Sequence, residues 1–370
     1  MEEESNFNNA GIRSAMPPFQ EIIQSWLSRK RDPRSTNECV ELPFILSTDI
    51  GLVRKENQDR VAAIHTGKKS INPIFAIAVA DGMGGMRNGG DCSTLAISSF
   101  FHSLIQHRNL SLYQRARAAI EEANSQIFKI YQGTGGSTLT AVIVDSHGAQ
   151  IFSHVGDTRI YTFNHNSLAK RHTTDDSLAE AVGGSGRELL QFVGMGESML
   201  PKISDLPITS ESCAITTDGI HSIEEKTLYK IFANCSDIKC AAERLGDLSR
   251  WCGGNDNATS AIFKPQEILN ALLRFESAGI RVWDASGELT TIWLRDDDQA
   301  SNVKHFNIDP KQQSLKTPEV KQETKAKKGR ASTKRTKKKK ESNDHYQGNI
   351  ELDIEFGGAD EHGEADDNSK

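Results

Sequence analysis

The sequence predicts an α+β fold, and three observations support that class. Short apolar runs rich in β-branched and aromatic residues recur from Pro43 onward, and Gly, Asp or Asn bounds each run, as is usual for strands. Two longer stretches, 89–106 and 112–132, carry apolar residues at helical spacing. Strands thus come in groups with helices inserted as a pair, which favours an α+β domain over alternating βαβ units.

The expected elements follow from these patterns. The strand-like runs are 43–50, 60–67, 74–81, 137–145, 149–157, 159–164, 213–219 and 258–263. Near the N-terminus, 18–30 has an amphipathic pattern, and we expect a short helix that docks on the main domain rather than on a partner. Residues 266–275 predict another helix. Residues 280–294 predict a hairpin, with its turn at Ala285-Ser286-Gly287-Glu288.

Charge and composition divide the 370 residues into four parts. We expect a polar N-terminal extension (1–42), a main domain (43–264), a helix-plus-hairpin extension (265–299) and a disordered tail (300–370). The net charge of −6 hides an uneven tail: 321–340 carry 11 Lys or Arg, whereas 341–370 carry 10 Asp or Glu. Few apolar residues and opposite charge blocks are typical of disorder.

The basic block of the tail leaves several functions open. It would bind nucleic acid, an anionic membrane surface or an acidic partner, or serve as a nuclear address. The simpler alternative is a solvated tail that pairs loosely with its own acidic end, because such attraction is screened beyond about 8 Å at physiological salt.

The cysteines and the N-terminus indicate a soluble, cytoplasmic protein. None of the six cysteines forms a C-x-x-C pair, so a zinc site or a disulfide scaffold is not expected, and a reducing compartment is. The acidic start MEEESNFNNA has no apolar core for a signal peptide. No apolar run approaches the roughly 20 residues of a transmembrane helix.

Five carboxylates follow or precede strand-like runs, and glycines neighbour most of them. They are Asp59, Asp81, Asp157, Asp218 and Asp256. Each alone fits ordinary turn chemistry. Together they would repel one another, so a group of them needs a cation. An all-oxygen ligand set favours Mg²⁺ or Mn²⁺ over Zn²⁺. Asp81 would bridge two ions, and Gly82, without a Cβ, would let its carbonyl approach one of them.

Six motifs in order carry a resemblance to a known family: GLVRKENQD, VADGMGG, GGSTLTAVIV, VGDTRIY, TTDGI and DNATSAI. From about Pro43 to Lys264 the chain resembles the bacterial-type branch of the metal-dependent type 2C serine/threonine protein phosphatases. The resemblance implies a four-layer α-β-β-α sandwich. Two antiparallel β-sheets would be flanked by helix pairs, with the acidic ligands in a cleft at one end.

The resemblance also implies a metal centre holding two Mn²⁺ or Mg²⁺ ions, with a weaker third. Asp81 would bridge the two ions, and Asp218 and Asp256 would complete the shell of the first. The Gly82 carbonyl would bind the second ion, and Asp157 together with Asp218 would bind the third.

Two further residues receive roles from the same resemblance. Asp59 would hold metal-bound water, and Arg54 would bind the substrate phosphate. Two cations about 4 Å apart lower the pKa of water, and the resulting hydroxide would attack phosphorus in line. The planar guanidinium of Arg54 suits phosphate oxygens better than Lys does. The alternative for Arg54 is an ordinary surface salt bridge.

The chain departs from the family at three places. Gln58 stands where some members have a Glu ligand, which would weaken the second ion. Met83 stands where some have a histidine proposed as general acid. His154 and His221 are candidates in sequence, although packed or surface histidines are commoner. The third departure is the flap after HTTDDSLAEAVGG (172–184), which is shorter than usual.

In that flap, Asp175 and Asp176 are expected to serve as turn or cap residues rather than to touch the third metal. The expected function is hydrolysis of phosphoserine and phosphothreonine on protein substrates, opposing a Ser/Thr kinase. The alternative is a catalytically weak phosphatase-like module that binds phosphoproteins or scaffolds a complex. A third hypothesis, nucleic-acid binding through the tail, predicts an affinity that falls steeply with salt.

Overall fold

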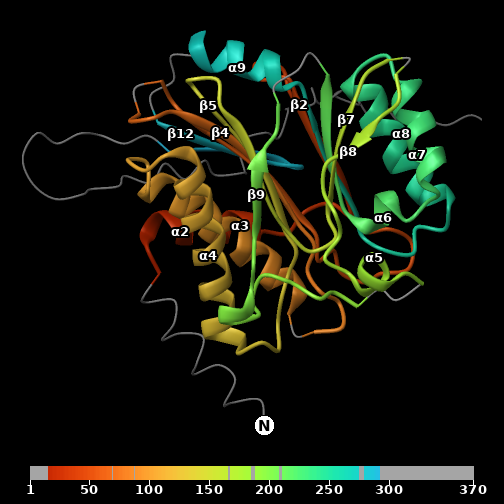
Figure 1. Cartoon of the computed structure of the whole chain (residues 1–370), viewed down its shortest axis with the longest axis horizontal. Helices are drawn as coiled ribbons and strands as arrows, with labels where there is room; N and C mark the ends of the chain where they lie inside the picture. Colours follow the sequence, from red (N-terminus) through yellow and green to blue (C-terminus); the bar gives the residue numbers. More distant parts are fainter. Residues whose placement is uncertain are drawn as a thin grey trace, which may run out of the picture. The chain divides into compact units, whose positions relative to one another are not determined.

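The structure, a computed structural model, describes residues 16–291 except 69, 87, 166, 185–187, 208–210 and 275–278. The predicted tail (300–370) and the last residues of the predicted hairpin (292–294) lie outside the described residues. Two antiparallel sheets organise the described chain (Figure 1). No helix in the described part combines the length and the apolar character that a membrane span needs.

The six-stranded sheet has the order β1-β2-β11-β10-β7-β8. Its strands are β1 (Arg34–Cys39), β2 (Phe44–Asp49), β11 (Ala258–Phe263), β10 (Ser212–Thr216), β7 (Arg159–Phe163) and β8 (Lys170–Arg171).

The seven-stranded sheet has the order β13-β12-β3-β4-β5-β6-β9. Its strands are β13 (Gly287–Thr291), β12 (Ile280–Asp284), β3 (Arg60–Thr66), β4 (Ile74–Ala80), β5 (Leu139–Asp145), β6 (Gln150–Val155) and β9 (Lys202–Asp205).

Strand β4 shows why these residues build two layers. Its side chains alternate between the two faces of the sheet, as in any strand. Phe75, Ile77 and Val79 enter the core between the two sheets, whereas Ala76 and Ala78 face the core under the helices. Large residues therefore fill the space between sheets, and alanines let a helix pack closely on the other face.

Helices cover the outer face of each sheet, which confirms the expected four-layer α-β-β-α sandwich. The seven-stranded sheet carries α2 (Pro18–Leu27), α3 (Gly89–Gln106) and α4 (Leu112–Tyr131). The six-stranded sheet carries α6 (Asp218–His221), α7 (Glu225–Ala233) and α8 (Ile238–Trp251). Figure 1 shows these two groups on opposite sides. The short helix α5 (Leu178–Val182), a 3₁₀ turn (Gly196–Ser198) and α9 (Pro265–Arg274) complete the described elements.

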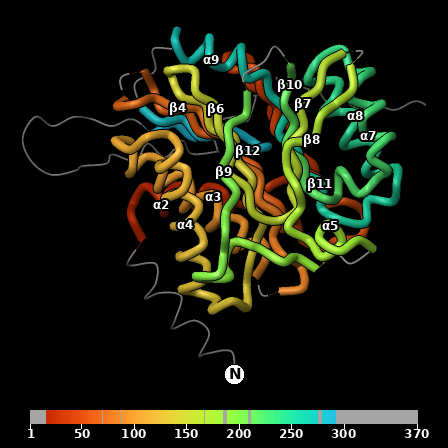
Figure 2. Tube along the Cα trace, in the orientation of Figure 1, coloured from red at the N-terminus to blue at the C-terminus, as the bar shows by residue number. Residues whose placement is uncertain are grey.

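The described parts of both extensions, 16–42 and 265–291 without 275–278, are built into the sandwich. Strand β12 pairs with β3, and Figure 2 shows this late blue strand beside the early orange ones. The β12–β13 connection is Ala285–Ser286; Gly287 and Glu288, expected in the turn, already belong to β13. Asp284 accepts two hydrogen bonds from the guanidinium of Arg29, at 2.7 and 2.8 Å, just beyond α2.

Candidate active site

The predicted site residues meet at one end of the sandwich. The register pairs Arg60 with Ala80, which brings Asp59 and Asp81, the next residues, to the same edge of the seven-stranded sheet. In the six-stranded sheet, Ala258 pairs with Asp49, so Asp256 lies beside the loop that contains Arg54. Sheet register alone therefore gathers residues that are far apart in the sequence.

A pocket of about 330 Å³ lies at this edge. The predicted site residues that line it are Arg54, Asp81, Gly82, Asp157, Asp218 and Asp256. Asp59, the seventh, is 2% exposed and lies behind the pocket, where its charge acts on Asp81. The described structure thus brings all seven together, whatever role each has.

Hydrogen bonds fix the backbone at Asp81 and leave its carboxyl group for the pocket. The Asp81 N–H donates to the Thr138 hydroxyl at 2.9 Å. The Asp81 carbonyl accepts from the Thr138 N–H at 2.8 Å and from the Ser137 hydroxyl at 2.9 Å. Gly82 follows at a close approach: a Cβ there would lie 2.2 Å from the Gly89 carbonyl oxygen. Packing against the start of α3 therefore requires this glycine, whatever its carbonyl binds.

Asp59 carries an oxygen without an ordinary partner. Its Oδ2 accepts a hydrogen bond from the Thr217 hydroxyl at 2.9 Å. Its Oδ1 is buried and meets no N–H or hydroxyl donor within the described residues. The carboxyl group of Asp81 is a close electrostatic neighbour. A buried carboxylate oxygen normally has a donor or a cation, so this orphaned atom fits a metal site.

Burial and mutual repulsion disfavour the ionised forms of the carboxyl groups in this site. Burial, and then the charge of Asp218, raises the pKa of Asp59 to about 7. The same two causes, with Asp175 adding to them, raise the pKa of Asp157 to about 7. Burial followed by four neighbouring carboxylates raises the pKa of Asp81 well above its usual value. A divalent cation would relieve that repulsion.

The carboxylates of the pocket lie near one another but do not surround a common point. Across the described ranges, no group of three or more His, Cys, Asp or Glu side chains has the spacing to hold a metal ion. Repulsion among carboxylates opposes closer approach. Asp256 forms an ion pair with Arg54, whose Nη2 lies 2.6 Å from its Oδ2. The donor set fits a divalent cation in chemistry, because carboxylate and carbonyl oxygens are the ligands that Mg²⁺ and Mn²⁺ prefer.

Arg54 forms a salt bridge, which was one of the two interpretations that the sequence left open, and it also borders the pocket. Its side chain is 42% exposed and borders the pocket. The hydrogen bond to Asp256, set against a smaller effect of burial, raises the pKa of Arg54. It therefore forms a salt bridge while remaining within reach of an anion in the pocket.

Asn257 is an important residue that the sequence reasoning missed. Its Nδ2 donates to the carbonyls of Ile50 and Glu56, each at 3.0 Å, and its Oδ1 accepts from the Gln58 N–H at 2.8 Å. It thereby fixes the loop that presents Arg54. Its position directly after Asp256 in the DNATSAI motif was the signal available.

The residues considered for the general acid do not offer an acidic group to the pocket. Met83 and Gln58 line it, and neither side chain titrates. His154 is buried between the Thr140 hydroxyl, at 2.8 Å, and the Thr174 carbonyl, at 3.1 Å. Burial lowers the pKa of His154 to about 4. Burial also lowers the pKa of His221 strongly, so both histidines are packed and neutral.

The flap aspartates hold structure rather than the pocket. Asp175 accepts charged hydrogen bonds from Arg159 and Arg171, each at 2.6 Å. The Asp176 carboxylate accepts from the Gly156 N–H at 2.9 Å and so braces the turn before Asp157. Asp176 therefore plays the turn role expected of it, whereas Asp175 forms ion pairs with two arginines instead.

The two-sheet sandwich and the acidic pocket define a class of protein, and comparisons with known proteins agree on it. The chain is 25% identical over 239 residues to a putative protein phosphatase 2C-type of Streptococcus pyogenes, covering 59% of this chain and 95% of that protein. It is 24% identical over 245 residues to the protein phosphatase PhpP of Streptococcus pneumoniae, covering 60% and 97%. With the serine/threonine phosphatase PstP of Mycobacterium tuberculosis the identity is 24% over 240 residues, covering 60% of this chain and 44% of PstP.

Solved structures support the same fold. The PPM Ser-Thr phosphatase MsPP of Mycobacterium smegmatis matches with a TM-score of 0.50 and 23% identity, covering 61% of this chain and 98% of MsPP. A bacterial serine phosphatase matches with a TM-score of 0.51 and 17% identity, covering 60% and 96%. No family model matches the sequence. The relatives, the fold and the ordered motifs agree, and the chain is similar to bacterial PP2C-type serine/threonine phosphatases.

Proposed function

We infer that this chain hydrolyses phosphoserine and phosphothreonine on protein substrates, opposing a Ser/Thr kinase. The observation that carries the proposal is the gathering of Arg54 and four aspartates around one pocket, with Asp59 buried behind it. Cationic Arg54 suits the phosphate, and the acidic group suits divalent cations.

The chain's own carboxylates are proposed to hold Mn²⁺ or Mg²⁺. Asp81, Asp218 and Asp256 would hold the first ion, while Asp81 and the Gly82 carbonyl would hold the second. Asp157 with Asp218 would hold a weaker third ion. Divalent cations bound here supply Lewis acidity and a nucleophile from water at neutral pH. The orphaned Oδ1 of Asp59 supports this arrangement, because it offers a buried acceptor where water would be oriented.

Arg54 is proposed to position the phosphate. Its guanidinium would exchange the Asp256 carboxylate for phosphate oxygens, while Asp256 would turn to a metal ion. Both side chains are partly exposed, 42% and 29%, so the exchange needs little displacement of the surrounding structure. The hydrogen bonds of Asn257 would hold the Arg54 loop in place throughout.

A cytoplasmic location is part of the proposal. All six cysteines are free, which fits a reducing compartment. The basic tail, with nucleic acid or an acidic protein as its partner, lies outside the described residues and stays a prediction. The alternative of a catalytically weak binding module gains no support from the site, because every aspartate of the proposed set is present.

The test is hydrolysis of a phosphothreonine peptide with and without Mn²⁺, for the wild type and for Asp81→Asn. Turnover that needs the metal and disappears in the variant is the expected result. Asp81→Asn removes one charge from a crowded group, so the variant should fold, and circular dichroism checks that. A wild type without turnover at any Mn²⁺ or Mg²⁺ concentration would favour the binding module instead.

A further inference from the structure

A second hollow adjoins the acidic pocket. It has a volume of about 210 Å³, and it shares Arg54, Asp218 and Asp256 with that pocket. Its remaining wall carries hydroxyl, amide and thiol groups and backbone, from Ser222, Ser249, Cys252, Gly254 and Asn255 among others. Because three residues line both spaces, the two form one continuous depression that leads away from the phosphate-binding arginine.

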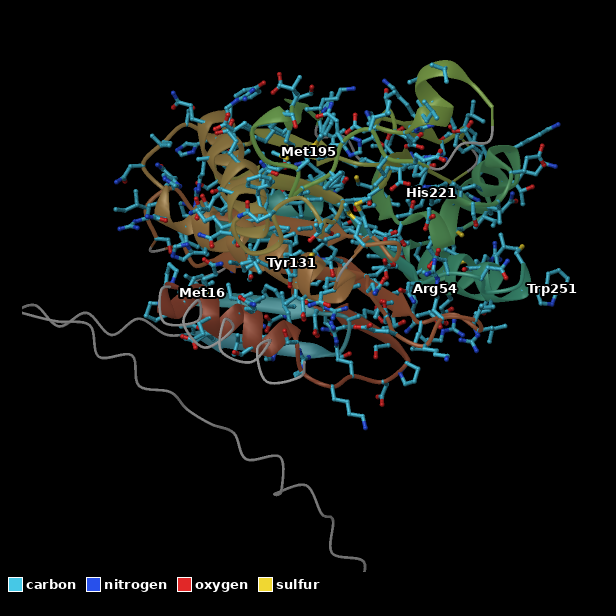
Figure 3. All side chains as sticks on the ribbon, turned by 90° about the horizontal axis from the view of Figure 1, so that it is seen from below. Met16, Arg54, Tyr131, Met195, His221 and Trp251 are labelled. Carbon is cyan, nitrogen blue, oxygen red and sulfur yellow. The ribbon has the colours of Figure 1, made fainter. Side chains whose placement is uncertain are left out.

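Three large apolar side chains stand exposed beside this hollow: Leu52 is 58% exposed, Val53 is 64% exposed and Trp251 is 90% exposed. We name these three residues the apolar ledge. Figure 3 shows Trp251 standing clear of the end of α8, on the same side of the molecule as Arg54. Aromatic side chains of this size usually bury most of their surface, so this degree of exposure needs a reason.

The two chain segments that form the ledge are joined. The Leu52 N–H donates to the Gly254 carbonyl at 2.7 Å. A Cβ on Gly254 would lie 2.9 Å from Leu52 Cγ, so the backbone there packs directly on the leucine. The turn between Trp251 and Gly254 is fixed by the Gly254 N–H, which bonds to the Ser249 carbonyl at 3.0 Å. The ledge is therefore a built surface and not two unrelated loops.

We propose that the apolar ledge and the second hollow bind the polypeptide of the phosphorylated substrate beside its phosphoresidue, with a preference for an apolar or aromatic neighbour. The proposal rests on the proposed function and names the class of substrate for it. A protein that presents its phosphate to Arg54 must lie across adjoining surface. Leu52 and Val53 directly precede Arg54, and an extended peptide advances about 3.3 Å per residue. A neighbouring side chain therefore reaches the ledge.

We assign the substrate polypeptide to the apolar ledge because the ledge adjoins the proposed phosphate site. Exposed apolar groups that adjoin a binding pocket mark interaction surfaces, and Trp is prominent among residues that dominate binding energy. Val40 offers a contrast. It is 93% exposed in the β1–β2 turn, at the opposite end of β2 from the ledge, and it adjoins none of the pockets described here.

The experiment compares two phosphothreonine peptides that differ only in having Phe or Ser within three residues of the phosphothreonine. For each enzyme, kcat/KM with Mn²⁺ is measured on both peptides, and the ratio is the readout. The ratio cancels any loss of overall activity or of folded enzyme. We expect wild type to favour the Phe peptide, and Trp251→Ser to reduce that preference about 10-fold. Val40→Ser, the matched control, keeps the wild-type ratio.

Each outcome decides one question. Equal kcat/KM on both peptides in wild type, or an unchanged ratio in both Trp251→Ser and Leu52→Ser, overturns the proposal. A change in oligomeric state on gel filtration with an unchanged ratio also overturns it, and assigns the ledge to a second copy of this chain. Failure of wild type to hydrolyse even p-nitrophenyl phosphate with Mn²⁺ counts against the proposed function itself, which separates the two failures.

Discussion

At the scale of single residues, Arg54 is the group proposed to position the phosphate in the pocket. Its guanidinium pairs with Asp256 at 2.6 Å and can present two N–H groups to a phosphate. Lysine would keep the charge but lose the planar fork. We expect Arg54→Lys to lower kcat/KM for a phosphopeptide about 10- to 100-fold, the loss of one or two charge-assisted hydrogen bonds. Steady-state kinetics measures it; a value within twofold of wild type would contradict the assigned role.

His154 makes stability depend on pH. Burial lowers its pKa to about 4 in the folded protein, whereas an unfolded histidine titrates near pH ~6.5. Between these values the unfolded chain binds a proton that the folded protein does not. The stability is therefore complete above the unfolded pKa and falls as the pH falls. Between neutral pH and pH ~5 the loss is about 2 kcal/mol.

Urea titrations of wild type and variants, each at neutral and at acidic pH, test this prediction about His154. His154→Gln should lose about 2 kcal/mol less than wild type over that range, because glutamine carries no titrating group. His165→Gln replaces an exposed histidine and should keep the wild-type pH dependence. Identical pH dependence in wild type and His154→Gln would show that His154 is not buried as a neutral ring.

Residue chemistry was also the part of the site most open to prediction. Asp59, Asp81, Asp157, Asp218 and Asp256 each stand at or beside a strand end, and glycine neighbours mark most of them in the sequence. What sequence could not supply is the second partner of each group. The contact of Arg54 with Asp256 spans 202 residues, and the bonds of Asn257 to the Arg54 loop span about as many. Such pairings exist only once the sheets are assembled.

At the scale of elements, the strands and helices with the most buried residues were the easiest to predict from the sequence. The strands with the richest apolar runs, such as β4 and β5, form where the sequence predicts them, and α3 occupies the predicted 89–106. Strand β1 was missed, because its alternating exposed edge, RSTNEC, carries almost no apolar signal. Helices α7 and α8 were also missed as separate elements. Each is shorter than α4, so its apolar face repeats over fewer turns and gives a shorter sequence signal.

The element-scale prediction concerns the clamp between the two terminal extensions. Asp284 is fully buried and accepts two hydrogen bonds from Arg29 and one from the Ser286 N–H at 2.8 Å. Removing one partner of a buried pair leaves a desolvated charge. Because Arg29 is 30% exposed, we expect Asp284→Asn to cost about 2–3 kcal/mol in unfolding free energy, below the cost for a fully buried pair.

A matched control lies in the same region. Asp247 pairs with Arg34 at 2.6 Å, but its side chain is 69% exposed. Asp247→Asn should therefore change the unfolding free energy by less than about 0.5 kcal/mol. Chemical denaturation measures both variants. Equal effects in the two would mean that burial of Asp284 contributes nothing to the clamp.

At the scale of the whole molecule, the described residues pack around three apolar cores. One core fills the space between the sheets, a second lies under α2, α3 and α4, and a third lies under α7 and α8. The C-terminal hairpin extends the seven-stranded sheet through β3, and the buried Trp283 packs against Phe44, 5.4 Å between ring centroids. The folded body therefore includes this hairpin, which lies beyond the region that resembles the family.

The charged tail is then separable from catalysis. Every proposed site residue lies between Met1 and Lys304, in the first of the two units into which the chain divides. A chain ending at Lys304 should keep the thermal midpoint of the full chain and its kcat/KM for p-nitrophenyl phosphate, because no core or pocket residue is removed. Should the full chain bind nucleic acid, that affinity should fall steeply with salt and vanish on truncation, since the 11 cations of residues 321–340 would supply it. A truncated chain with less than half the activity of the full chain would instead make the tail part of the enzyme.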